Sequence, residues 1–196
     1  MQDHHTEASQ DSFHFLDEQE VIVYDFDASG LMLDIGGGGE GVIGQLKGDQ
    51  VVAIDRNWRE LQEAPDGPLK IVMDAADMKF LDDTFETATS FFSLMYMSAA
   101  LHADVFADVF RVLKPGGRLL IWDASLPEKL NTDKEYVAFY LTVILPDRQI
   151  RTGYGTQWPA QARDWSYYEQ LAISVGFMSQ DHRETGAVFY LELRKP

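Results

Sequence analysis

An aspartate and an isoleucine followed by four consecutive glycines, Gly36 to Gly39, form the densest chemical signal in the sequence. Glycines let a backbone turn sharply and approach a ligand closely, and a helix that follows them offers free N–H groups at its start. The spacing of Gly36, Gly38 and Gly41 also satisfies the dinucleotide fingerprint, with Asp55 about 20 residues further on, where a carboxylate could hold ribose hydroxyls. The segment therefore predicts a nucleoside-binding loop.

Asp34, two residues before the first glycine, separates two kinds of nucleoside. In a nicotinamide site the anionic pyrophosphate lies on the glycine loop, and a carboxylate here would repel it. S-adenosylmethionine brings a sulfonium and an ammonium to the same region, and both are attracted to a carboxylate. The residue types therefore favour S-adenosylmethionine, and a nicotinamide-dependent oxidoreductase is the less favoured alternative.

Short apolar runs alternate with helical patterns from residue 31 to residue 122, which is typical of βαβ units. Most of the runs end at an acid or a glycine, as buried parallel strands do where they lead into functional loops. Near the C-terminus, the pattern predicts a helix that closes at Gly176 and then an antiparallel hairpin. The expected strands are 31–35, 51–54, 69–73, 87–94, 118–122, 177–183 and 187–193, and the expected helices are 41–46, 56–63, 98–113 and 167–175.

The segments around these strand ends resemble, in order and spacing, the motifs of the class I S-adenosylmethionine-dependent methyltransferases. The similarity covers 31–123 well and the closing hairpin more loosely, and FRVLKPGGR at 110–118 is its most characteristic block. The other matching segments are 34–38, 51–55 and 73–75. The resulting fold prediction is an α/β, Rossmann-like three-layer sandwich, with a seven-stranded, mostly parallel sheet and one antiparallel strand from the C-terminal hairpin.

The resemblance also implies roles for residues near the glycine loop. The backbone of Gly36, Gly37 and Gly38 would cradle the methionine part of S-adenosylmethionine, with Asp34 near its amino group. Asp55, at the end of the second strand, would accept hydrogen bonds from both ribose hydroxyls. Each carboxylate is a strong acceptor at the carboxyl end of a strand, where open α/β sheets hold ligands.

Around the adenine, the resemblance implies Arg56 beside the ring, Asp74 accepting from the amino group, the Ala75 amide nearby, and Phe91 at the mouth of the fourth strand. The glycine loop departs from the family pattern, because Gly39 and Glu40 separate Gly38 from Gly41, so the loop is either longer than usual or has Glu40 in the place where a glycine is usual. The residue that meets the methionine carboxylate is therefore left open.

No catalytic residue and no metal site is assigned from the sequence. Tyr154, Tyr136 and His102 are candidates for a general base, with a surface histidine as the preferred interpretation of His102. The aromatic-rich region 124–164, with a glycine-hinged stretch at 152–156, is interpreted as a substrate-covering insertion in a single domain of 13–196, preceded by a mobile tail at 1–12. The region could instead be a second packing layer over the sheet.

Composition narrows the possible partners. The net charge of −16, from 32 acidic and 16 basic residues, argues against nucleic acid, since such a surface repels phosphate backbones. The chain has no cysteine and no apolar run long enough for a membrane span, so a cytoplasmic protein is expected. The predicted function is methyl transfer from S-adenosylmethionine to a small or medium acceptor, and the alternative is a non-catalytic protein that binds or senses S-adenosylmethionine. Neither the acceptor nor the oligomeric state follows from the sequence.

Overall fold

The computed structural model describes residues 10–196. Most of the predicted tail at 1–12 lies outside this part of the chain, and its last residues form the short 3-10 helix η1 (Gln10–Ser12). No helix within 10–196 combines the length and the apolar character needed to cross a membrane.

A seven-stranded sheet forms the centre of the molecule. Its strands are β3 (Met32–Ile35), β4 (Val51–Asp55), β5 (Leu69–Val72), β6 (Phe85–Phe91), β7 (Leu113–Ala124), β10 (Met178–Thr185) and β11 (Val188–Arg194). Their order is β10-β11-β7-β6-β3-β4-β5, with parallel pairs from β7 to β5 and antiparallel pairs where β11 meets β7 and β10. All seven strands correspond to runs that the sequence predicts.

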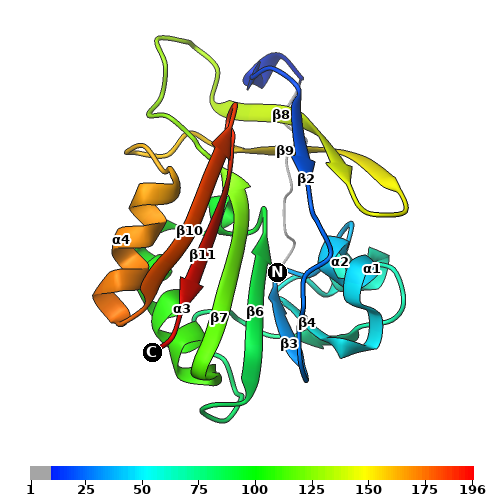
Figure 1. The fold of residues 1–196 in the computed structure, drawn as a ribbon. Coiled ribbons are helices and arrows are strands. Elements are labelled where there is room, and N and C mark those ends of the chain that lie inside the picture. The colour runs from blue at the N-terminus through cyan, green and yellow to red at the C-terminus, as the bar shows by residue number, and fades with distance from the viewer. Residues whose placement is uncertain (1–9) are drawn as a thin grey trace, which may run out of the picture.

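Helices cover both faces of this sheet (Figure 1). The short helices α1 (Val42–Lys47) and α2 (Trp58–Glu63) pack on one face, and the longer α3 (Ala99–Val112) and α4 (Trp165–Val175) pack on the other. Successive side chains of a strand point to opposite faces of the sheet, so neighbouring residues of one strand pack into the core on opposite sides. In β3, for example, Leu33 packs in the cluster that contains α3 and α4, and Met32 packs in the cluster that contains α1 and α2.

A second, four-stranded sheet was not predicted. It consists of β1 (Phe13–Phe15), β2 (Gln19–Ile22), β8 (Tyr136–Ile144) and β9 (Gln149–Gln157). Strands β1 and β2 run parallel to β8 along one edge, and β9 runs antiparallel along the other. Strands β8 and β9 cross the top of Figure 1, above the end of the central sheet where β6 and β7 finish.

The fold prediction is therefore confirmed at the level of an α/β fold with a seven-stranded sheet, and is correct only in part beyond that. Antiparallel pairs link β7, β11 and β10, and the second sheet adds the antiparallel pair of β8 and β9. The stretch 152–156, predicted to be a glycine hinge, is part of β9. Its glycines fit against aromatic rings: a Cβ on Gly155 would lie 3.1 Å from Cε1 of Phe13, and one on Gly153 would lie 3.4 Å from Cδ1 of Tyr140.

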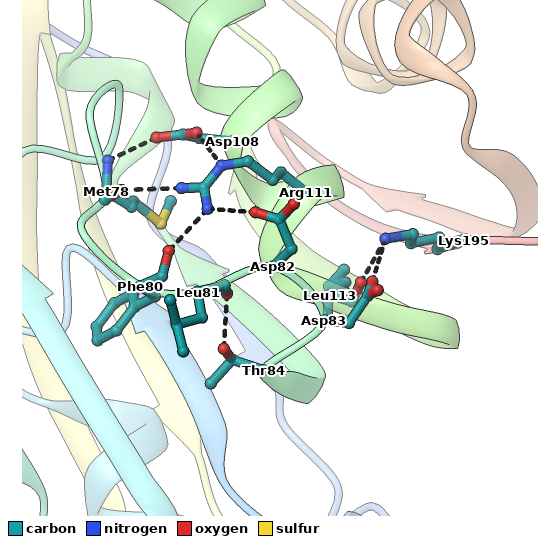
Figure 2. A network of polar contacts seen from close by, with 10 residues as sticks. All are labelled: Met78, Phe80, Leu81, Asp82, Asp83, Thr84, Asp108, Arg111, Leu113 and Lys195. Carbon is teal, nitrogen blue, oxygen red and sulfur yellow. Dashed lines mark hydrogen bonds and ion pairs between the residues drawn. The ribbon is translucent and has the colours of Figure 1, made fainter.

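The block that resembles the family most strongly has a structural role centred on Arg111 (Figure 2). Its Nε donates to Asp108 Oδ1 (2.9 Å), and its two terminal nitrogens donate to the carbonyl oxygens of Met78 (2.8 Å) and Phe80 (2.7 Å) and to Asp82 Oδ1 (2.9 Å). The planar guanidinium suits such a forked set of acceptors. Arg111 thus ties the loop between β5 and β6 to α3.

Candidate functional site

A cavity of about 1030 Å³ opens at the carboxyl ends of β3, β4, β5 and β6. Every residue that the sequence assigns to cofactor binding lines this one cavity: Asp34, Gly36, Gly37, Gly38, Asp55, Arg56, Asp74, Ala75 and Phe91. Four separate segments of the chain supply them, because parallel strands end at the same edge of a sheet. Their assembly in one place follows from the fold, and the contact that each makes with a ligand stays a prediction.

The glycine loop lies against its neighbours with no space for side chains. The Gly36 amide donates to the Ile54 carbonyl oxygen (2.8 Å), which ties the start of the loop to the end of β4. A Cβ on Gly36 would lie 2.3 Å from Ser93 Cβ, and one on Gly38 would lie 2.5 Å from Glu60 Cβ. The loop therefore exposes backbone to the cavity, as close approach to a ligand requires.

Replacing Gly36 by alanine is expected to lower the free energy of unfolding by about 3 kcal/mol, because it adds overpacking against Ser93 to the strain of a positive φ. Gly116→Ala is the control. Gly116 has a similar φ of 78°, against 71° for Gly36, and an added Cβ would meet only Nη2 of the flexible Arg194 side chain at 3.8 Å, so it should lose only the backbone contribution of about 1 to 2 kcal/mol. Urea unfolding of both variants tests this, and equal losses would show that the contact with Ser93 costs nothing.

Asp34 is the most deeply buried carboxylate of the cavity lining, with 2% of its surface exposed. The Thr89 hydroxyl donates to its Oδ1 at 2.7 Å. Burial raises the pKa of Asp34 to about 7, since the hydrogen bond from Thr89 only partly offsets desolvation and the charge of Asp55 adds repulsion. A cation placed beside Asp34 would relieve this cost.

Asp55 and Asp74 are more open to the cavity. Asp55 Oδ1 accepts from the Asn57 amide (2.7 Å), which orients the carboxylate at the end of β4. Asp74 Oδ1 accepts from the Ala76 amide (2.9 Å), and its Oδ2 lies 3.6 Å from Arg56 Nε. Both carboxylates keep an oxygen without a close backbone partner, so each can accept a hydrogen bond from a ligand.

One end of the cavity is aromatic and includes β9. The ring of Phe92 is parallel to the ring of Tyr154, with centroids 5.0 Å apart, and the Tyr96 ring lies 6.5 Å from Tyr154. Phe92 has a φ of 47°, which is unusual for a residue with a large side chain and marks a sharp turn after β6. Glu40 extends from the glycine loop to this end, where its carboxylate accepts from the Tyr154 hydroxyl (3.2 Å).

Comparison with known proteins agrees with this geometry. The family model described as a methyltransferase domain matches residues 33–121. The ubiquinone/menaquinone biosynthesis C-methyltransferase of Desulfotalea psychrophila is 40% identical over 75 residues, which are 38% of this chain and 29% of that protein. Its counterpart in Saccharophagus degradans is 36% identical over 102 residues, which are 52% of this chain and 36% of that protein. Residues 33–121 are thus similar to a methyltransferase domain, which supports a class I S-adenosylmethionine-dependent methyltransferase.

Solved structures with low sequence identity share the fold of this chain. An S-adenosylmethionine-dependent methyltransferase from Mesorhizobium loti matches with a TM-score of 0.61 and 15% identity, over 87% of this chain and 94% of that one. Phosphoethanolamine N-methyltransferase 2 of Haemonchus contortus, in complex with S-adenosylmethionine, matches with a TM-score of 0.63 and 14% identity. The match covers 88% of this chain and 50% of that one. The chain spans less than half the length of the curated relatives that it matches.

The residues of the cavity fit the cofactor of the family, S-adenosylmethionine. The loop has no room for a Cβ at Gly36 or Gly38, so backbone rather than side chains lines the cavity at these two positions. Carboxylates stand at the ends of β3 and β4 and just after β5, and these groups suit an ammonium, two ribose hydroxyls and an amino group. The comparisons support S-adenosylmethionine as the cofactor.

The structure changes the interpretation of the candidate bases. His102 is fully buried rather than on the surface, because it lies on the apolar stripe of α3 one turn before Val105. Its Nδ1 lies 2.9 Å from the Tyr167 hydroxyl and its Nε2 lies 3.1 Å from the Leu94 carbonyl oxygen, outside the cavity lining. Tyr136 packs against Phe13 and also lies outside the lining.

The tyrosines that do line the cavity are poor bases. Burial raises the pKa of Tyr154 far above its usual value, and the neighbouring Glu40 raises it further. Desolvation around its hydroxyl likewise raises the pKa of Tyr96 to about 12, although the residue as a whole is 52% exposed. Both phenols therefore stay protonated at neutral pH and can donate a hydrogen bond.

Some cavity residues were not predicted from the sequence: Asn57, Glu60, Glu63, Phe92, Ser93, Tyr96, Met97, Ser98, Leu101 and Gly153. Phe92 to Ser98 follow the end of β6 directly, so the rule that ligands bind beyond the carboxyl ends of strands could have found them. Gly153 and Tyr154 come from β9, and only the pairing of β8 with β9 brings them to the cavity.

Proposed function

We propose that this chain transfers the methyl group of S-adenosylmethionine to a small or medium-sized acceptor. The observation that carries the proposal is the assembly of every predicted cofactor residue around one cavity at the carboxyl ends of β3 to β6. When bound, S-adenosylmethionine supplies an electrophilic methyl group on a sulfonium. The protein has to hold this group and the acceptor in line and away from water.

The residues have distinct roles in this proposal. Asp55 accepts from the ribose hydroxyls, Asp74 accepts from the adenine amino group, and Asp34 faces the ammonium of the methionine part. Arg56 and Phe91 lie beside the adenine, and the Ala75 amide lies nearby. The backbone from Gly36 to Gly38 approaches the methionine part.

The size of the cavity supports an enzyme over a binding or sensing protein. Its volume of about 1030 Å³ lies just above the range of about 300 to 1,000 Å³ for small-molecule sites, which leaves space for an acceptor beside the cofactor. Tyr96 and Tyr154 line this space instead of filling it. The region 124–164, through β9, would cover the acceptor, and we place the whole domain of 13–196 in the cytoplasm.

The test combines binding and turnover. We expect calorimetry to give a dissociation constant for S-adenosylhomocysteine that is at least about tenfold lower than for NAD, because Asp34 repels a pyrophosphate. With S-adenosylmethionine labelled in its methyl group, the protein should transfer label to a compound in a small-molecule extract. Tighter binding of NAD would overturn the cofactor assignment, and tight binding without transfer would favour the sensing alternative.

A further inference from the structure

We propose that the acceptor of this methyltransferase is an amine, held as its ammonium form by Glu40 against the rings of Tyr96 and Tyr154. This inference rests on the proposed function, because it takes the aromatic end of the cavity as the acceptor site. Three observations support the amine acceptor: the charge of the cavity lining, the aromatic wall and the position of Glu40.

The cavity repels anions. Among the described residues of its lining, six carry carboxylates and Arg56 alone is cationic. Arg56 is the ion-pair partner of Asp74, at the end assigned to the adenine. The carboxylates repel one another, and the pKa of Glu60 shows the effect. Burial is the largest cause of its raised pKa, and the charges of Glu63, Asp55 and Glu40 raise it further. A carboxylate or phosphate on the acceptor would add to this repulsion, whereas a cation would reduce it.

The acceptor end combines aromatic faces with one carboxylate. Tyr96 is 52% exposed, so its ring is available to a ligand, and the parallel pair of Phe92 and Tyr154 forms the adjoining wall. Aromatic faces attract cations, and more strongly where water is excluded. Glu40 already accepts from the hydroxyls of Tyr154 and Thr152, which fix its carboxylate at this wall. A carboxylate accepts about four hydrogen bonds, so it has sites left for an ammonium.

The position of Glu40 also accounts for the proton of the reaction. An ammonium cannot attack, so it must first give a proton, and the Glu40 carboxylate takes it. The nitrogen lone pair of the neutral amine then forms the bond to the methyl carbon, the carbon–sulfur bond breaks, and its electron pair stays on sulfur. The products are S-adenosylhomocysteine and an N-methylated ammonium, and the proton on Glu40 leaves to solvent. The tyrosine hydroxyls do not serve as this base because they stay protonated.

Three probes that share a 2-phenylethyl group test the charge preference: 2-phenylethylamine, 2-phenylethanol and 3-phenylpropanoate. Each is titrated by calorimetry into protein saturated with S-adenosylhomocysteine. We expect the dissociation constant of the amine to be at least about tenfold below that of the alcohol, and the carboxylate to bind more weakly than both. Absence of amine binding, or tighter binding of the alcohol or the carboxylate, would overturn the proposal.

Glu40→Gln tests the assigned residue, and Glu128→Gln, which removes the same charge from an exposed loop position outside the cavity, is the control. We expect Glu40→Gln to raise the dissociation constant of the amine by about tenfold while those of the alcohol and of S-adenosylhomocysteine change less than about twofold. If S-adenosylhomocysteine weakens as much as the amine does, Glu40 serves the cofactor and the amine proposal fails. The proposed methyl transfer itself would survive that result, because S-adenosylhomocysteine binding by the unaltered protein tests it separately.

Discussion

Asp55→Ala is expected to raise the dissociation constant of S-adenosylhomocysteine by at least about 100-fold. A hydrogen bond to a charged group contributes about 1.5 to 3 kcal/mol, and the proposed role gives Asp55 two of them from the ribose. The fold should tolerate the change, because within residues 10–196 this carboxylate accepts one hydrogen bond, from the Asn57 amide at the start of α2. Calorimetric titration measures the effect directly.

Two further variants separate a ligand contact from a general effect of charge or structure. Asp66→Ala removes an exposed carboxylate from the loop after α2, outside the cavity, and should bind as the unaltered protein does. Asp55→Asn keeps an oxygen for the Asn57 amide but loses the charge, so an intermediate loss of affinity is expected. If Asp55→Ala binds S-adenosylhomocysteine within about threefold of the unaltered protein, the ribose lies elsewhere.

The cofactor side of the cavity could be predicted from the sequence because its residues occupy the ends of strands that are themselves easy to recognise. The runs ending at Ile35 and Asp55 are short, apolar and followed by glycine or a helix, and the parallel order of the strands places their ends together. Local sequence therefore determines both the strand and the position of the chemical group that follows it.

The acceptor side could not be predicted in the same way, because its residues depend on contacts between distant segments. Strand β9 contains Gly153 and Gly155, which weaken any strand pattern read locally. In the folded chain the rings of Tyr140 and Phe13 lie over these glycines and supply the packing that their own side chains lack. These rings belong to β8 and β1, so the packing over the glycines of β9 becomes visible only when the three strands are paired.

The pH dependence of stability should identify Asp34 as the buried acid of the cofactor site. Its pKa rises from 3.8 in the unfolded chain to about 7 in the folded chain. Between these values the folded protein holds a proton that the unfolded chain releases, so stability falls as the pH rises from about 4 to about 7 and is level above that. Each unit of pKa difference corresponds to about 1.4 kcal/mol, which gives a loss on the order of 4 kcal/mol.

Asp34→Asn stays neutral throughout and keeps an oxygen for the Thr89 hydroxyl, so it should escape this loss. We therefore expect its free energy of unfolding, relative to the unaltered protein, to increase by about 4 kcal/mol between pH 4 and pH 8 in urea titrations without cofactor. Asp123 also has a pKa raised to about 7 by burial, and its contribution cancels because both proteins contain it.

The same variant should bind S-adenosylhomocysteine more weakly at pH 8 although it is more stable there. The ammonium of the ligand pairs with an ionised carboxylate, and an amide offers it no charge. Replacing a structural group would lower both the stability and the affinity for the ligand. An increase in stability together with a loss of affinity therefore indicates an acid that faces the ligand. A stability difference that does not vary with pH would mean that Asp34 is ionised across the whole range, and an unchanged affinity would mean that the ligand ammonium lies away from it.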